Sequence, residues 1–323
     1  MKAIVRERYG SPDVLELRDV DKPVLDDDSV LVKVRAASIN AYDWHMMRGL
    51  PFLARMSEGL RKPKSIAMGV DVAGQVEAVG KNVTHLRPGD EVFGARSGAL
   101  AEYVRGSAKS FLVPKPAGLT FEQAAAMPMA ATTALQGLRD RGQLKAGQTV
   151  LINGAAGGVG TFAVQIAKAL GAHVTAVCST RNVDMVRSIG ADEVVDYTRE
   201  DFTKRGQAYD LILDVAASRP LSECRRVLAS NGTLVLVGAP DGRRMGPIVA
   251  RILAMIVLSR FASQKLLPFL AKNNKEDLMF LKELVEAGRI RPVIDRTYPL
   301  SETAAAIRYL EEGHARGKIV ITV

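Results

Sequence analysis

The chain has 323 residues, a net charge of +9 and a hydrophobic fraction of 47%. This length suffices for about two domains with full cores, and the composition is ordinary for a soluble protein. No block of five or six lysines and arginines occurs, which argues against a specific nucleic-acid-binding tail. The two cysteines, Cys178 and Cys224, are too few for a disulfide framework or a cysteine-rich zinc site. Reduced thiols favour a cytoplasmic location.

The first part of the chain is predicted to be rich in β-strands. Short apolar runs separated by Gly, Pro and Asp give candidate strands at 2–5, 15–18, 30–37, 70–79, 91–93 and 101–105. This pattern is typical of a barrel-like domain. No signal peptide is predicted at the N-terminus. The segment 114–119, PKPAGL, marks a boundary between this part and the next.

Strands and helices alternate in the middle of the chain. Thr120 is expected to cap a helix, and a second helix is expected at about 130–140. Candidate strands follow at 149–153, 173–178, 193–196, 211–215 and 233–237, with helices between them, for example at 182–188 and 221–228. This alternation predicts an α/β fold with a doubly wound parallel sheet.

The last part of the chain is predicted to be helical at first and mixed afterwards. Residues 246–288 favour helix, interrupted at Pro268, and a strand, a helix and a closing strand are expected at 293–298, 302–311 and 318–323. The longest apolar run, 248–258, contains Arg251 and is too short to span a bilayer. A core or interface helix is favoured there over membrane contact, and the segment 247–270 is left open as a pocket wall, a homodimer surface or a membrane-contacting segment.

A glycine-rich turn lies between a predicted strand and a predicted helix. The stretch 150–170 reads VLINGAAGGVGTFAVQIAKAL, and its turn comprises Ala155, Ala156, Gly157, Gly158, Val159 and Gly160. Glycines let the backbone approach a pyrophosphate, and the first N–H groups of the helix face it. Tight packing of helix on strand is the alternative explanation. The context favours a dinucleotide site.

Several ordered motifs resemble a known family over essentially the whole chain. They are SINAYDWHMMRG (38–49), GVDVAGQVEAVG (69–80), RPGDEVFG (87–94), NGAAGGVG (153–160), GADEVVDY (190–197) and GHARGKIVI (313–321). The sequence resembles the medium-chain dehydrogenase/reductase superfamily, in its zinc-free quinone-oxidoreductase-like branch, which includes the reticulon-interacting mitochondrial protein group. The resemblance implies a GroES-like β domain over 1–119 and 290–323, and a Rossmann domain over 120–289.

The same resemblance argues against a zinc ion. In the register fixed by Asp43, the first zinc-binding cysteine of the family falls at Asn40, and the family's Gly-His-Glu falls at Gly69-Val70-Asp71. A valine cannot bind a metal, and the four-cysteine structural lobe is missing as well. Neither a catalytic nor a structural zinc is therefore expected.

The residues after the second strand of the alternating part favour NADPH over NADH. NAD enzymes usually place an acidic residue about 20 positions beyond the glycine turn. Here that position is Cys178, followed by Ser179, Thr180 and Arg181. Arginine suits a two-pronged phosphate contact. The alternative is that Arg181 is a solvated residue at the start of a helix and binds no phosphate. The resemblance also implies that Tyr197 lies beside the 2′-phosphate.

At the nicotinamide end, the resemblance implies contacts from Asn40 and Thr133 and from the strand-end residues Val215, Val237 and Gly238. Plain packing at the strand ends is the alternative role of the apolar residues among them. Lys318 either neutralises the site or is a surface lysine. Tyr42 is the candidate proton donor nearest to Asn40 in sequence, and a packed aromatic is the alternative role.

Together these features predict an enzyme that transfers hydride from NADPH to a quinone, an enone or another activated carbonyl. Such acceptors are electrophilic enough to react without a Lewis acid. Three alternatives remain: an NAD(P)-dependent alcohol dehydrogenase, an NADPH-binding sensor without turnover, and a nucleic-acid binder drawn by the positive charge. The expected partner is a small molecule, with a homodimer possible and no membrane span.

Overall fold

The computed structural model describes residues 1–323 except 51, 53–54, 108–110 and 239–244. The chain divides into two compact units. Unit 1 comprises Met1–Met129, Asn273–Glu286 and Pro292–Val323. Unit 2 comprises Ala130–Lys272 and Ala287–Arg291. The domain boundaries given above stay a prediction.

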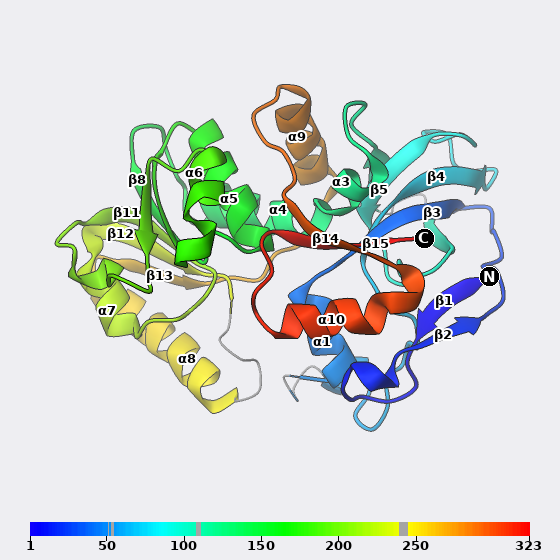
Figure 1. The fold of residues 1–323 in the computed structure, drawn as a ribbon, viewed down its shortest axis with the longest axis horizontal. Coiled ribbons are helices and arrows are strands. Elements are labelled where there is room, and N and C mark those ends of the chain that lie inside the picture. The colour runs from blue at the N-terminus through cyan, green and yellow to red at the C-terminus, as the bar shows by residue number, and fades with distance from the viewer. Residues whose placement is uncertain (51, 53–54, 108–110, 239–244) are drawn as a thin grey trace. The chain divides into compact units, whose positions relative to one another are not determined.

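Unit 1 is built around a mostly antiparallel sheet in which strands from the C-terminal end of the chain join strands from its first part (Figure 1). The sheet order is β14-β15-β3-β4-β5-β7, and β6 pairs with β3. The strands β1 and β2 form a separate antiparallel pair. The closing strand β15 lies antiparallel to β3, with Ile319 opposite Ile39. The strands of unit 1 are β1 (Lys2–Val5), β2 (Glu16–Asp19), β3 (Ser29–Ile39), β4 (Asp71–Val79), β5 (Glu91–Ala95), β6 (Tyr103–Ser107), β7 (Phe111–Pro114), β14 (Ile294–Pro299) and β15 (Lys318–Thr322).

Short helices cover and connect this sheet. Thr120 caps α3 as expected, because its hydroxyl accepts the N–H of Gln123 and the Gln123 side chain accepts the N–H of Thr120. The helices of unit 1 are α1 (Ala41–Arg48), α2 (Arg55–Glu58), α3 (Phe121–Ala125), α9 (Lys275–Glu286) and α10 (Thr303–Glu311), with 3₁₀ turns at Pro12–Val14 and Leu300–Glu302.

Unit 2 contains a sheet in which all the strands run parallel. Its order is β10-β9-β8-β11-β12-β13, which in chain order is the 3-2-1-4-5-6 arrangement of dinucleotide-binding folds. The predicted doubly wound α/β fold is thus confirmed. The strands of unit 2 are β8 (Thr149–Asn153), β9 (His173–Cys178), β10 (Glu193–Asp196), β11 (Tyr209–Asp214), β12 (Leu228–Leu236) and β13 (Lys265–Pro268).

Helices connect the parallel strands of unit 2. The helix expected at about 130–140 consists of α4 (Pro128–Leu135) followed by a π-helical turn (Gln136–Arg141). The other helices are α5 (Gly158–Ala169), α6 (Val183–Ser188), α7 (Leu221–Arg226) and α8 (Met245–Phe261), with 3₁₀ turns at Thr180–Asn182 and Phe202–Lys204.

The prediction that 246–288 is mostly helical was wrong at β13. This short strand lies at the edge of the parallel sheet and pairs with β12. Leu266 is buried in the core there, and Pro268 ends the strand at an edge that tolerates a residue without an N–H donor. The strand β7 was also missed. Among the described helices, none is both long and apolar enough to cross a lipid bilayer.

Candidate functional site

The glycine turn of unit 2 joins the central strand β8 to α5. Gly157 is the N-cap residue of α5 and offers no side chain to cap it. The first-turn N–H groups, from Gly158 to Gly160, therefore remain for a ligand at the positive end of the helix dipole. Gly160 keeps the turn tight, because a Cβ there would lie 2.1 Å from the carbonyl oxygen of Gly154. Ala155 and Ala156 are buried beneath the turn.

The turn lies beside the ends of two neighbouring strands. The side-chain amide of Asn153, at the end of β8, donates to Asp214 Oδ1 at the end of β11 over 2.7 Å. The N–H of Val237, after β12, donates to the carbonyl of Asp214 over 3.0 Å. Gly238 packs so closely on this strand end that a Cβ there would lie 1.8 Å from the carbonyl oxygen of Val215. The structure thus brings the glycine turn, Val215, Val237 and Gly238 together at the point where the strand order reverses, which is where open α/β sheets bind ligands.

A buried ion pair holds the loop that follows β11. The guanidinium of Arg251, on α8, donates to Asp214 Oδ2 over 2.6 Å and to the carbonyl oxygen of Arg219 over 2.9 Å. Asp214 Oδ1 also accepts the N–H of Ala217, a residue with a φ of 50°. Burial raises the pKa of Asp214, and Arg251 opposes this shift. Sequence reasoning missed this network, although Asn153 and Asp214 both end apolar strands.

The residues proposed for the 2′-phosphate lie at the ends of β9 and β10. The N–H of Tyr197 donates to the carbonyl of Cys178 over 3.0 Å, so the two strand ends are adjacent. The side chains of Arg181 and Tyr197 are exposed, and the Ser179 hydroxyl accepts a hydrogen bond from Asn182 over 3.1 Å.

A carboxylate also lies at these strand ends, on β10, although none occurs at the end of β9 that the sequence argument considered. Asp196, the last residue of β10, accepts hydrogen bonds from the hydroxyls of Thr180 and Thr198. These bonds lower the pKa of Asp196, and the Thr180 bond contributes most. The expectation rested on the end of β9 alone, whereas the parallel pairing places Asp196 opposite Cys178. The Asp196 side chain therefore belongs to this part of the site.

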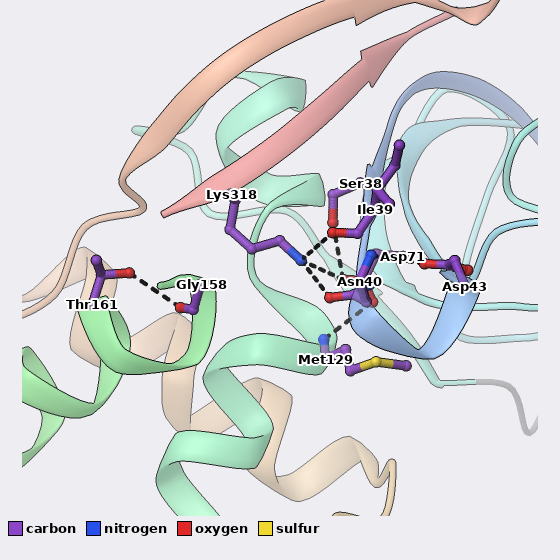
Figure 2. A network of polar contacts seen from close by, with 9 residues as sticks. All are labelled: Ser38, Ile39, Asn40, Asp43, Asp71, Met129, Gly158, Thr161 and Lys318. Carbon is purple, nitrogen blue, oxygen red and sulfur yellow. Dashed lines mark hydrogen bonds and ion pairs between the residues drawn. The ribbon is translucent and has the colours of Figure 1, made fainter. Parts of the chain in front are cut away.

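In unit 1, a buried polar cluster joins three strands (Figure 2). Asp71, the first residue of β4, accepts hydrogen bonds at Oδ2 from Asn40 Nδ2 over 2.9 Å and from the Ser38 hydroxyl over 3.0 Å. Its Oδ1 accepts the N–H of Met129 over 3.1 Å. The sheet register places Ser38 opposite Asp71, which explains why these groups meet.

Lys318 completes this cluster from the first position of β15. Its ammonium group donates to Asn40 Oδ1 and to the carbonyl of Ile39, and it lies 3.5 Å from Asp71 Oδ2. Because the ammonium only donates and the carboxylate only accepts, the amide orientation of Asn40 is fixed. Lys318 is 3% exposed, so the alternative role as a surface lysine was wrong.

Burial shifts the titration of the charged groups in this cluster. It raises the pKa of Asp71, against the opposing effects of Lys318, Asn40 and Ser38, and it lowers the pKa of Lys318. Asp43, in the first turn of α1, accepts the N–H of Asn40 over 2.8 Å. Burial raises the pKa of Asp43 to about 7.

The raised pKa of Asp43 predicts a stability that falls with pH. The folded state keeps the Asp43 proton up to about pH 7, whereas the unfolded chain releases it near the ordinary pKa of 3.8. Stability therefore decreases as the pH rises from about 4 through 7. We expect the Asp43→Asn variant to lose much of this slope in urea unfolding measured across that range. An unchanged slope would contradict the assignment.

Two further predicted site residues have clear positions. Tyr42 lies in the first turn of α1 and is 42% exposed, and burial of the remainder raises the pKa of its phenol. The side chain is thus partly packed and partly accessible, and its role as a proton donor or as a packed aromatic stays a prediction. Thr133 lies on α4 and is half-buried.

The donor set around Asn40 does not fit a zinc ion. Zinc sites of this type use thiolate, imidazole and carboxylate ligands, and here the corresponding positions hold Asn40, Val70 and Asp71. Moreover, the ammonium of Lys318 already lies beside the Asp71 carboxylate, and it would repel a second cation. Within the described ranges, no group of three or more His, Cys, Asp or Glu side chains is arranged to hold a metal.

A parallel sheet with a glycine turn, together with a GroES-like β unit, defines a dehydrogenase/reductase of the dinucleotide-binding class. Sequence comparison agrees: the alcohol dehydrogenase GroES-like domain matches residues 26–117, and a family described as zinc-binding dehydrogenase matches residues 189–321. The chain belongs to the medium-chain dehydrogenase/reductase superfamily, and it is an oxidoreductase.

Similar proteins cover the full length of the chain. The mitochondrial NAD(P)H oxidoreductase RTN4IP1 of Mus musculus is 36% identical, over 100% of this chain and 89% of the relative. The quinone oxidoreductase of Coxiella burnetii has a TM-score of 0.85 and 32% identity, over 100% of this chain and 99% of the other. The Escherichia coli quinone oxidoreductase, solved with NADPH, has a TM-score of 0.83 and 25% identity, over 100% of both chains.

Proposed function

We propose that this protein uses NADPH to reduce a quinone, an enone or another activated carbonyl without a zinc ion. The observation that supports this proposal is the buried cluster in which the ammonium of Lys318 contacts Asn40 and Asp71, two residues that stand at the positions matched above to the family's metal ligands. Without a Lewis acid, the acceptor itself must be electrophilic, as quinones and enones are. The Coxiella burnetii and Escherichia coli neighbours carry the name quinone oxidoreductase, which supports this acceptor class.

The residues at the strand ends of unit 2 fit a dinucleotide. The uncapped first turn of α5 would hold the pyrophosphate, with Ala155, Ala156, Gly157, Gly158 and Val159 forming the turn. Val215, Val237 and Gly238 would line the nicotinamide side, and Thr133 would contact it as well. When bound, the cofactor supplies the hydride.

The choice of NADPH rests on Ser179, Arg181 and Tyr197. These residues offer a hydroxyl, a guanidinium and a phenol at the ends of β9 and β10, and all three groups can bind a phosphate. Asp196 works against this preference, because its carboxylate is bound to Thr180 at the same strand ends. We expect the positive groups to outweigh it.

The Asp196→Asn variant tests this balance. Removing the carboxylate should raise the ratio of kcat/KM for NADPH to that for NADH by about fivefold, because a unit charge a few ångströms from the phosphate costs about 1 kcal/mol in water. Steady-state kinetics with both cofactors measures the ratio. Glu200→Gln is the matched control, since Glu200 is an exposed carboxylate four positions further on that interacts with Arg205. Equal ratios in the wild type and in Asp196→Asn would contradict a position beside the phosphate.

Asn40 and Tyr42 are the residues that we place at the substrate. Asn40 is held in one orientation by Lys318 and Asp71 and presents a fixed dipole. The partly exposed phenol of Tyr42 is protonated at neutral pH, because the ordinary pKa of tyrosine is 10.0 and burial raises it further, and we assign it the proton that the reduced acceptor takes up.

A stopped-flow experiment tests the proposed function as a whole. The protein is mixed with NADPH and with a panel of quinones, enones, aldehydes and alcohols in the presence of a chelator, and oxidation of NADPH is followed by absorbance. We expect turnover with quinones or enones and a kcat/KM at least about tenfold higher with NADPH than with NADH, a difference of about 1.4 kcal/mol. Binding of NADPH without oxidation across the panel would instead indicate a sensor.

The cytoplasmic location stays a prediction, because the mouse relative is named as mitochondrial.

A further inference from the structure

The outer face of α8 carries a continuous apolar stripe. Leu253, Val257 and Phe261 are 56%, 54% and 86% exposed, and they follow one another at four-residue intervals, so they lie on one side of the helix. Val249 and Ile256 extend the same stripe. Figure 1 shows α8 in yellow at the margin of unit 2. Exposed apolar side chains that are contiguous on one helix face make that face a candidate binding surface.

The inner face of α8 already packs against the core of unit 2. The exposed stripe is therefore not part of that core. Met255 is fully buried in the core of unit 2, and Ile252 and Leu258 pack against the same core. Arg251 is fixed by its ion pair with Asp214. The helix is therefore anchored, and its exposed side chains are not needed to hold it in place.

The sequence segment that carries the stripe is basic. The stretch 245–275 contains no aspartate or glutamate, although Glu276 and Asp277 follow it directly, and its basic residues are Arg251, Arg260, Lys265, Lys272 and Lys275. Of these, Arg260, Lys265 and Lys272 are exposed in the structure. Apolar side chains flanked by cations are the pattern of helices that lie in the interface of an anionic membrane.

We propose that the outer face of α8 docks onto the surface of an anionic lipid bilayer. The side chains of Leu253, Val257 and Phe261 enter the boundary between headgroups and acyl chains, while Arg260 and Lys265 contact lipid phosphates. The helix lies along the surface and does not cross the bilayer.

Charge favours this partner over a second copy of the chain. A two-fold interface places the same patch on both sides. A patch whose exposed charged side chains are Arg260, on α8, and Lys265, at the start of β13, would then bring like charges into one interface, and the stretch 245–275 contains no acidic residue to compensate them. A bilayer rich in anionic lipid removes that repulsion.

Sedimentation with lipid vesicles tests the docking directly. The full-length protein is mixed with vesicles of equal parts phosphatidylcholine and phosphatidylglycerol, and with vesicles of phosphatidylcholine alone. We expect binding to the anionic vesicles at low salt and much weaker binding to the neutral ones. Binding to the anionic vesicles should also weaken as the salt concentration rises, because exposed charges are screened. No binding to the anionic vesicles at low salt would overturn the proposal.

Matched surface variants separate the apolar from the electrostatic part. Phe261→Ser and Leu253→Ser should each weaken partitioning by about tenfold, and Arg260→Gln and Lys265→Gln by about fivefold. Val24→Ser and Lys204→Gln are the controls, because Val24 and Lys204 are exposed elsewhere on the chain. Equal partitioning of the α8 variants and the controls would overturn the proposal.

Two further results would overturn the proposal by showing that the outer face of α8 has another occupant. If Phe261→Ser converted a dimer to a monomer, the stripe would be an interface between copies. If Leu253→Ser raised the KM for a water-soluble quinone, the stripe would be a pocket wall. The sedimentation experiment needs no turnover, so its outcome is independent of the proposed reductase activity.

Discussion

Replacing Lys318 with methionine is expected to lower the free energy of unfolding by about 3–5 kcal/mol, because it leaves the buried Asp71 carboxylate without a cation. Asp71 is fully buried, and the remaining hydrogen bonds come from the neutral groups of Asn40, Ser38 and Met129. The methionine side chain fills similar space but carries no charge that could neutralise the Asp71 carboxylate. The loss should be smaller at low pH, where Asp71 is protonated, because burial raises its pKa.

A double-mutant cycle in urea unfolding measures this effect. The double variant Lys318→Met/Asp71→Asn should cost less than the sum of the two single variants, since it removes both buried charges. Lys2→Met is the matched control: Lys2 pairs with Asp19 at 3.1 Å, but both side chains are exposed. Such a surface pair contributes about 0–1 kcal/mol. Additive costs in the Lys318–Asp71 cycle would show that the two charges are not coupled.

Local patterns made much of the parallel sheet predictable from the sequence. The bounds of β8, β9 and β10 match the predicted strands, because each is a short apolar run that ends at glycine or polar residues. The glycine turn was predicted for the same reason. At β13 the same approach failed, because four residues next to a proline carry too little periodicity to distinguish a strand from a broken helix.

Contacts between distant segments were the part that could not be predicted. Lys318 and Asp71 are separated by 247 positions, and only the pairing of β15 and β4 with β3 brings them to one place. Asp196 joins the ends of β9 and β10 through strand order in the same way. The motif GADEVVDY contains Asp196, but counting about 20 positions from the glycine turn ends at Cys178 and does not reach the carboxylate of the neighbouring strand.

The second large effect is expected at Gly160. A Cβ at this position would lie 2.1 Å from the carbonyl oxygen of Gly154 and 2.7 Å from the backbone of Ala155. Both neighbours are backbone atoms of the turn itself, so the turn must move away from the start of α5. We expect Gly160→Ala to lower the free energy of unfolding by about 2–3 kcal/mol, as overpacking does elsewhere. It should also weaken NADPH binding by at least about tenfold, because the N–H groups that we propose to face the pyrophosphate would be displaced.

Gly157→Ala separates the two consequences, since the residue is in the same turn but has room for a methyl group. Its added Cβ would lie 3.7 Å from the nearest atom, the carbonyl oxygen of Gly154, and its backbone has a φ of −81° that alanine readily adopts. Stability measured by urea unfolding should therefore change little. The Kd for NADPH, measured by fluorescence titration, should still rise, because the methyl group lies where the pyrophosphate approaches the helix. If Gly157→Ala left the Kd unchanged while Gly160→Ala lost only stability, the turn would serve packing alone, and NADPH would have to bind elsewhere.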